Sequence, residues 1–268
     1  MDIKILVATH KRYWMPSDDV YLPIHVGREG KEDLGYMGDN TGENISNKNA
    51  NYCELTGLYW AWKNLKCDFI GLCHYRRYFS INDIVNKIKV YKNFKDVEKY
   101  IFKKADYEHL LKDYDIILPQ KVFSKKLTMY ESYKKDHHIR DLDECYKIIC
   151  ELYPEYKSAF NSSMNKKWFY PANMFVMKRE YFNNYMEWLF KILFELEKRI
   201  DISDYDNYQA RIYGFLSERL FTVWLEKNNL NKKEVTMLFV EEFNLPFATE
   251  ANIFRYYRRK IKVFFKNK

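Results

Sequence analysis

Two adjacent arginines, Arg76 and Arg77, end an apolar segment that begins at Ile70, and His74 stands just before them. A guanidinium keeps its charge at any physiological pH, and its planar fork matches the oxygens of phosphate or carboxylate groups bidentately. Two such groups at the end of a buried strand require an anion. We therefore predict an anion-binding site that contains His74, Arg76 and Arg77.

A carboxylate of the chain itself could also satisfy these arginines. In that alternative, one guanidinium pairs with Asp68 or Glu54 and the other is solvated. Glu54 could also orient Arg76 or Arg77 from behind, since it lies one turn into an expected helix. The two interpretations differ in whether the guanidiniums are free to bind a ligand.

Composition limits the class of protein. The chain has 268 residues, of which 47% are hydrophobic, and its formal net charge is +8. It can bury the core of one large α/β domain, alone or with an appendage. Residues 253–268 hold three Arg, four Lys and no acid, so the remainder is nearly neutral. A nearly neutral body argues against nucleic-acid binding.

Cysteine usage and hydropathy indicate a compartment. The five cysteines show no Cys-x-x-Cys spacing, which is typical of reduced thiols in a cytoplasm. The N-terminus lacks the charged-then-apolar pattern of a signal peptide. No segment reaches the roughly 18 uncharged apolar residues that a membrane span requires. We therefore expect a protein that stays on the cytoplasmic side.

Alternating strand and helix patterns must position the arginines. They predict an α/β fold with a mostly parallel sheet flanked by helices, whose ligands bind beyond the carboxyl ends of the strands. Expected strands cover 3–8, 21–26, 68–74, 115–119, 235–240 and the end of 168–177, and expected helices cover 52–66, 142–152, 180–200 and 208–227.

The remaining segments are expected to be less regular. Residues 35–51 predict a functional loop that leads into the helix at 52, with Asn49 or Asn51 as its cap. Residues 121–140 predict a mobile loop. We expect one domain over 1–245, with an insertion or mobile region at 81–165, and a basic amphipathic tail over 246–268.

Several blocks resemble a bacterial family of capsular and exopolysaccharide biosynthesis proteins. The resemblance extends from the first strand to about residue 225, and it is least distinctive over 81–165. Its blocks are Thr9-His10-Lys11, His25-Val26-Gly27, residues 38–46, residues 51–64, Cys73-His74-Tyr75-Arg76-Arg77-Tyr78-Phe79 and residues 214–220. The family is similar to glycosyltransferases of the GT-A type, and some members are described as galactosyl or galactofuranosyl transferases.

The resemblance implies hexosyl transfer from a UDP-sugar to a lipid-linked acceptor of capsular or exopolysaccharide synthesis. GT-A enzymes usually place Asp-x-Asp and a divalent metal at the strand end that this chain occupies with His74, Arg76 and Arg77. A metal or positioned cations can neutralise the departing diphosphate. We infer that Arg76 and Arg77, with His74, replace the metal, so that no cofactor is expected. Arg219 is a further expected contact of the donor diphosphate.

Metal binding stays an alternative because Asp-x-Asp strings occur elsewhere, at residues 113–115, 141–143 and 204–206. The first precedes a strand, at the wrong end for a donor site. The other two precede helices, where acids complement the helix dipole. The third string is the best candidate if a metal is bound, and the other two strings and Asp39 are the remaining candidates.

An inverting transfer also needs a base for the acceptor hydroxyl. Glu218 interrupts an otherwise apolar helical segment, so it either pairs with Arg219 or Arg211 or lines the active site. Asp39 and Asp206 are the second choices for the catalytic carboxylate.

The resemblance also suggests substrate contacts. Expected nucleotide contacts are Thr9, His10, Lys11, Asn44 and Asn51, each of which could instead be a surface loop residue. Expected contacts with the transferred sugar or the acceptor are Asn173, Trp168 and Tyr170. Core packing is the alternative for the two aromatic residues, because aromatic residues make up 18% of the chain.

The tail over 253–268 alternates bulky apolar residues with cations, as interfacial helices on anionic lipid do. Each cation near such a surface contributes roughly 1 kcal/mol. We therefore expect peripheral attachment to the inner face of the plasma membrane. A solvated basic helix is the alternative. For the whole chain, the alternative to an enzyme is a non-catalytic module that binds phosphorylated glycan or lipid.

Overall fold

The computed structural model describes residues 1–82, 87–90 and 94–242, and these residues share a nine-stranded sheet. Its order is β10-β7-β11-β5-β4-β1-β2-β3, with β6 paired to β11 and β10 also paired to β4. The strands are β1 (Ile3–Thr9), β2 (Tyr21–His25), β3 (Met37–Gly38), β4 (Phe69–His74), β5 (Arg77–Ser80), β6 (Lys87–Val90), β7 (Ile116–Pro119), β10 (Phe175–Lys178) and β11 (Lys232–Glu242). A separate ribbon pairs β8 (Val122–Phe123) with β9 (Trp168–Phe169).

The predicted α/β class is confirmed, and the sheet is mixed rather than wholly parallel. Strands β1, β2, β3 and β4 pair in parallel, and β7 and β6 pair in parallel with β11. Strands β5 and β10 run in the opposite direction. The direction of β5 reverses because it follows β4 through the short turn at Tyr75 and Arg76, which leaves no room for a crossover helix. The prediction treated that turn only as a binding site.

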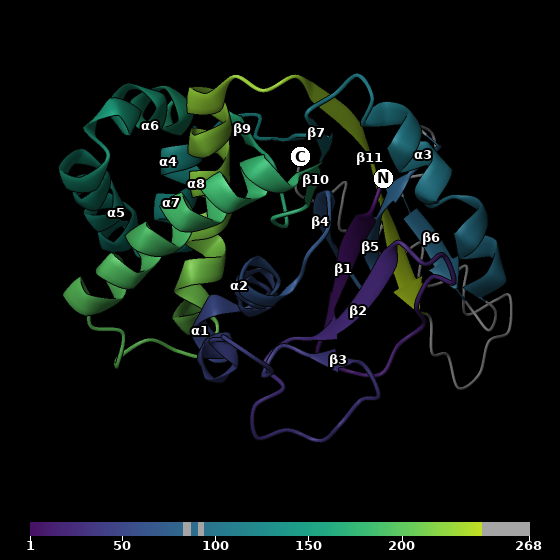
Figure 1. Cartoon of the computed structure of the whole chain (residues 1–268). Coiled ribbons are helices and arrows are strands. Elements are labelled where there is room, and N and C mark those ends of the chain that lie inside the picture. Colours follow the sequence, from purple (N-terminus) through teal and green to yellow (C-terminus); the bar gives the residue numbers. More distant parts are fainter. Residues whose placement is uncertain (83–86, 91–93, 243–268) are drawn as a thin grey trace, which may run out of the picture.

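Helices cover both faces of the sheet (Figure 1). Helices α2 and α4 to α8 pack against one face around the larger apolar cluster, and α3 covers the other face with the 13–15 loop. The helices are α1 (Asn49–Tyr52), α2 (Leu55–Asn64), α3 (Lys104–Leu110), α4 (Met129–Asp136), α5 (Ile139–Leu152), α6 (Lys157–Met164), α7 (Arg179–Arg199) and α8 (Ile212–Asn228). Short 3₁₀ helices are η1 (Ser46–Lys48), η2 (Phe94–Lys99), η3 (Pro154–Tyr156) and η4 (Gln209–Arg211).

Strand β4 lies close to β10 because Gly71 has no side chain. A Cβ at Gly71 would lie 2.7 Å from the backbone oxygen of Phe175. Any larger residue would push these paired strands apart. The close pairing matters because β4 ends in His74 and β10 begins just after Asn173.

The helix expected over 52–66 is interrupted. Helix α1 ends at Tyr52, and α2 begins at Leu55 after Cys53, whose φ is 52°. Neither Asn49 nor Asn51 caps α2; its N-cap residue is Glu54, without a side-chain cap bond. The capping prediction was therefore wrong, because the backbone turns at Cys53.

The segment 121–140 contains strand β8 and helix α4, so the prediction of a loop was wrong. Thr128 and Glu131 form a reciprocal capping box at the start of α4. Tyr133 of the same helix is fully buried. The polar composition suggested a loop because only two side chains of this helix, those of Met129 and Tyr133, are buried.

The predicted domain bounds, the 81–165 insertion and the basic tail stay predictions. The 81–165 region supplies β6 and β7 to the shared sheet, and it also contains α6, which the sequence analysis missed. The basic tail over 246–268 lies outside the described residues. No helix within the described ranges is both long and apolar enough to cross a bilayer.

Candidate functional site

The candidate site lies at the carboxyl edge of the central strands. Ala8 is paired with His74, and Thr9 is paired with His25, so β1, β2 and β4 end at the same level. Strand β10 runs antiparallel to β4, so the residues that precede it reach the same edge. The strand register therefore brings His74 and Asn173 to the edge where Thr9 and His10 lie.

The ring of Tyr75 organises one half of the edge. The His10 ring packs edge-on against it, with ring centroids 5.5 Å apart. Lys11 Nζ lies 5.4 Å and Arg76 Cζ 5.1 Å from the Tyr75 centroid. One aromatic ring thus gathers three cationic or titratable side chains from two loops.

These cations create a positive field. Partial burial of the exposed His10 ring lowers its pKa, and the charges of Lys11, Lys31, Arg76 and Arg211 lower it further. A neutral imidazole is favoured there, which leaves the positive charge on the neighbouring lysine and arginine side chains. An anionic ligand would reverse this effect and raise the pKa of His10.

Arg76 and Arg77 act on different neighbours although they are adjacent in sequence. Arg77 begins β5 and pairs with His74 in the ladder. Burial lowers the pKa of His74, and the charge of Arg77 lowers it further. The same charge opposes a rise in the pKa of Glu218, whereas Arg76 acts on His10. We therefore divide the edge into two halves. The cationic half contains His10, Lys11, Arg76 and Arg211, and the carboxylate half contains His74, Arg77 and Glu218.

The cations of the edge are not neutralised within the part of the chain that the structure describes. No ion pair there within 4.0 Å includes Lys11, Arg76, Arg77 or Arg211. Asp68 accepts a hydrogen bond from the backbone N–H of Asp2. The alternative in which a carboxylate of the chain pairs with Arg76 or Arg77 therefore lacks support.

A strained turn positions Asn173. Both Ala172 and Asn173 have left-handed φ angles, 65° and 51°. Such strain in non-glycine residues persists only where neighbours hold the backbone. The carbonyl of Ala172 lies 2.7 Å from His74 Nε2, and its N–H donates to Glu218 Oε1 at 2.7 Å.

The Asn173 amide joins this turn to two helices. Its Nδ2 donates to Glu54 Oε1 at 2.7 Å and to Ser217 Oγ at 2.8 Å. Ser217 Oγ in turn donates to the carbonyl of Gly214 at 2.8 Å. Asn173 is 2% exposed, so this amide serves to hold the site together. Direct contact between Asn173 and a sugar stays a prediction.

Glu218 lies at the centre of the second half. Its Oε2 accepts from Arg219 Nη1 at 2.9 Å, and its Oε1 accepts from the N–H of Ala172. Burial raises its pKa, a negative charge on Glu54 raises it further, and Arg219, the Ala172 N–H and Arg77 oppose the rise. Each oxygen keeps an acceptor position, and the side chain is 22% exposed. These are properties of a general base.

Arg219 supports Glu218 from inside the protein. Its side chain is 6% exposed, and its Cζ lies 4.6 Å from the ring centroid of Phe169 and 5.4 Å from that of Tyr133. Nη1 also donates to the carbonyl of Phe215 at 3.1 Å. This burial favours the interpretation that Arg219 pairs with Glu218; its predicted contact with a diphosphate is untested.

The second-choice carboxylates have structural partners. Asp39 is fully buried and accepts from the backbone N–H groups of Gly27 and Arg28 and from the hydroxyls of Ser46 and Thr56. With two donors on each oxygen, its acceptor capacity is filled.

Asp206 is exposed at the start of η4. It accepts from the backbone N–H groups of Tyr208 and Gln209, each at 2.8 Å. This is the helix-start role that the sequence analysis weighed against metal binding. Within the described ranges, no group of three or more His, Cys, Asp or Glu side chains is placed to hold a metal ion.

The residues expected to contact the nucleotide differ in exposure and in their hydrogen bonds within the protein. Thr9 is 1% exposed, and its hydroxyl donates to the Lys11 carbonyl at 2.6 Å. Asn44 donates to the carbonyl of Gly42 at 2.9 Å, and Asn51 donates to that of Ala210 at 2.8 Å. The side chains of His10 and Lys11 are exposed at the edge. They are the better placed to contact a nucleotide.

Trp168 and Tyr170 differ in access. Tyr170 is 3% exposed and donates to Glu234 Oε1 at 2.7 Å, so it belongs to the core. Trp168 is half-buried, and the Nζ atoms of Lys121 and Lys166 lie 4.4 and 5.6 Å from its centroid. Stacking of Trp168 on a sugar stays a prediction.

Sequence reasoning missed three residues of the site. It gave Ser217 no role, and it considered Glu54 and Arg211 only as partners of other side chains. Arg211 Nε lies 3.3 Å from the Cys53 Sγ, which places it beside the strained turn of α1. The sequence contains a signal for Arg211. This arginine lies just before an apolar helix whose first turn has no acid, so no carboxylate of that turn can pair with it.

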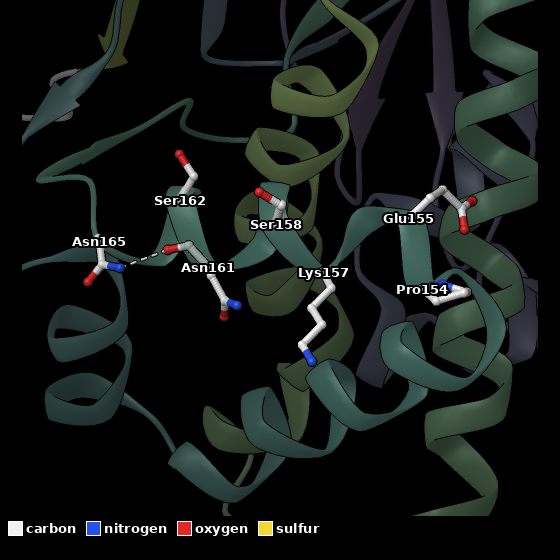
Figure 2. Close-up of a pocket in the computed structure, with 7 residues that line it drawn as sticks. All are labelled: Pro154, Glu155, Lys157, Ser158, Asn161, Ser162 and Asn165. Atoms are coloured by element: carbon white, nitrogen blue, oxygen red, sulfur yellow. Dashed lines mark hydrogen bonds between the residues drawn. The ribbon is translucent and has the colours of Figure 1, made fainter.

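A polar hollow of about 590 Å³ lies elsewhere, on η3 and α6 (Figure 2). None of the predicted site residues lines it. Its lining residues are Pro154, Glu155, Lys157, Ser158, Asn161, Ser162 and Asn165.

Comparison with known proteins provides an independent view. Residues 4–229 match the family described as "Domain of unknown function (DUF4422)". Among solved structures, the chain is similar to the apo structure of the WbbM bifunctional glycosyltransferase, with a TM-score of 0.84 and 32% identity over 93% of this chain. The match covers 48% of that protein, so the chain spans about half its length. Comparison with curated proteins gives no match.

Proposed function

This chain belongs to the family described as "Domain of unknown function (DUF4422)", and we propose that it is a glycosyltransferase. The similarity to WbbM over nearly the whole chain supports this proposal. The proposed reaction moves a hexosyl group, galactosyl or galactofuranosyl, from a UDP-sugar to a lipid-linked repeat unit of capsular or exopolysaccharide. The observation that carries the proposal is the set of unneutralised cations at the carboxyl edge of the sheet.

The cationic half of the edge would bind the donor diphosphate. Lys11, Arg76 and Arg211 act together on His10 and have no ion-pair partner among the described residues. Charge develops on the leaving nucleoside diphosphate as the glycosidic bond breaks, and fixed cations stabilise it. We therefore propose a metal-independent enzyme of GT-A type.

The carboxylate half would activate the acceptor. In an inverting transfer, Glu218 takes the proton of the acceptor hydroxyl while that oxygen attacks the anomeric carbon. Arg219 and the N–H of Ala172 orient the carboxylate, and the charge of Arg77 also acts on it. The raised pKa of Glu218 makes the carboxylate a stronger base than an ordinary glutamate.

The test is sugar transfer from UDP-sugars to a lipid-linked acceptor, detected by mass spectrometry with and without EDTA. We expect transfer that survives EDTA and is strongly reduced in Arg76→Ala at low donor concentration. The control Arg140→Ala removes an exposed guanidinium outside the site and should keep transfer. Loss in EDTA with recovery in Mn²⁺ would establish the metal-dependent alternative.

A non-catalytic module is the second candidate, since the chain spans only about half of a bifunctional protein. It would bind phosphorylated glycan or lipid through the same cations. Binding that depends on Arg76, without turnover of any nucleotide sugar, would favour this candidate.

Membrane attachment through residues 253–268 is also part of the proposal. Their composition supports a peripheral position on the cytoplasmic face, where a lipid-linked acceptor is accessible. Deletion of residues 253–268 should weaken binding of the protein to anionic vesicles, and unchanged binding would reject this role.

A further inference from the structure

Two large apolar residues are exposed on the ribbon of β8 and β9. They lie in the region of residues 121–127 and 166–168, which we call the ribbon tip. Phe123 is 71% exposed and Val122 is 45% exposed, and Phe123 exposes the largest fraction among the large apolar residues that the structure describes. Phe123 is paired with Trp168 across the ribbon. Neighbouring exposed apolar residues rimmed by polar groups are a feature of protein and membrane interaction sites.

Lysines surround this tip. Lys125 and Lys126 follow Phe123 and are exposed, and Lys167 is exposed on the adjoining strand segment, where its carbonyl accepts from the Ser124 N–H at 2.7 Å. Lys121 and Lys166 lie next to Trp168. The tip therefore combines aromatic, aliphatic and cationic groups.

Few acids offset these lysines. Residues 116–130 and 156–179 contain no Asp or Glu. Lys121 pairs with Glu234 at 2.6 Å and Lys166 pairs with Glu226 at 2.8 Å. Lys125, Lys126 and Lys167 form no ion pair within the described ranges. Their charge remains available to an external anionic surface.

The ribbon is joined to the candidate site. Strand β7 runs in the same direction as β4, so the chain that leaves Pro119 emerges at the carboxyl edge. Strand β9 leads within three residues to the strained turn at Ala172, and Phe169 lies under Arg219, the partner of Glu218. Strand β9 also contacts α8, beside which it lies in Figure 1.

We propose that the ribbon tip, residues 121–127 with 166–168, docks on an anionic lipid surface. Phe123 and Val122 would enter the interfacial region, and Lys125, Lys126 and Lys167 would contact lipid phosphates. This proposal does not depend on the transferase activity or on residues 253–268. It provides a second contact with a bilayer, beside the Glu218 half of the edge.

The first experiment measures binding of the full chain to phosphatidylcholine vesicles with and without phosphatidylglycerol. Lys125→Gln with Lys126→Gln should weaken binding to the anionic vesicles about 30-fold, since each cation contributes roughly 1 kcal/mol. Phe123→Ser should weaken binding about tenfold. The matched controls, Lys134→Gln with Lys135→Gln and Ile81→Ser, should bind as the wild type does.

A second measurement uses the unaltered protein, so misfolding of a variant cannot obscure the result. Anionic vesicles should protect Lys125 and Lys126 from acetylation, read by mass spectrometry, while Lys134 and Lys135 react as before. Equal labelling with and without vesicles overturns the proposal. It is also overturned if the lysine variants keep vesicle binding and lose binding to RNA, which would indicate a nucleic-acid surface.

Discussion

Asp39 and Glu218 are both acids held by backbone N–H groups, yet their surroundings differ. Asp39 is fully buried and receives two donors on each oxygen. Glu218 is 22% exposed, receives one donor on each oxygen, and has a pKa that burial raises. A saturated acid stabilises a loop, whereas an acid with free acceptor capacity at an accessible edge can take a proton.

The largest expected effect is the loss of activity in Glu218→Gln. Removal of a general base lowers the rate about a hundred- to ten-thousand-fold. The free energy of unfolding should change by only about 1 kcal/mol, because the amide relieves the burial of a charge while it gives up one acceptor. Transfer assays with thermal unfolding test both. The control is Glu226→Gln on the same helix, which pairs with Lys166.

Nearly normal transfer in Glu218→Gln would remove the proposed role of that carboxylate. It would also break the comparison with Asp39, since neither acid would then take part in chemistry.

The second effect is a loss of stability in Asp39→Asn. An asparagine cannot accept four hydrogen bonds, and its NH₂ would face donors, so we expect a loss of about 3 kcal/mol in the free energy of unfolding. Chemical denaturation measures it. Asp141→Asn is the control: Asp141 is 1% exposed but accepts one side-chain hydrogen bond, from Tyr205, so its loss should be smaller.

A third prediction concerns pH. Because the folded state raises the pKa of Glu218 above 4.5, kcat/KM should increase as pH rises through that raised value. The charge of Arg77 opposes the rise, so Arg77→Met should move the acidic limb to higher pH. Arg76→Met, which acts on His10, should leave the limb in place and raise the donor KM. Identical profiles for the two variants would contradict the division of the edge.

The pH dependence of the free energy of unfolding should report the same raised pKa of Glu218, independently of activity. A raised folded-state pKa means that the folded protein binds this proton more tightly than the unfolded chain. The contribution of Glu218 to stability is therefore complete below pH 4.5 and is lost as pH rises through the folded value. The difference in unfolding free energy between wild type and Glu218→Gln should follow this trend.

The sequence predicted much of this edge because its signals are local. The apolar runs of β1 and β4 and the polar residues after them located His10, His74 and Arg76 at strand ends. Strand direction was not local: a hairpin at Tyr75 reverses β5, and no periodicity reports that reversal.

Other features depend on contacts between distant segments. The strained turn at Ala172 exists because His74 and Glu218, 98 and 46 residues away, hold its carbonyl and N–H. Likewise, four donors from three segments determine the role of Asp39, which its own neighbourhood in the sequence could not reveal.

The smallest expected effect concerns Ser217, which connects the Glu218 helix to Asn173. Ser217→Ala removes one acceptor of the Asn173 amide but leaves its bond to Glu54, so we expect a loss of about 1 kcal/mol in stability and less than about tenfold in activity. Ser163→Ala is the matched control, since that buried hydroxyl has no hydrogen-bond partner among the described residues and its removal should be nearly neutral. If both alanine variants unfold alike, the Asn173 link contributes nothing. If Ser217→Ala instead abolishes transfer while the protein stays folded, the Asn173 network belongs to the chemistry of Glu218 and not only to its support.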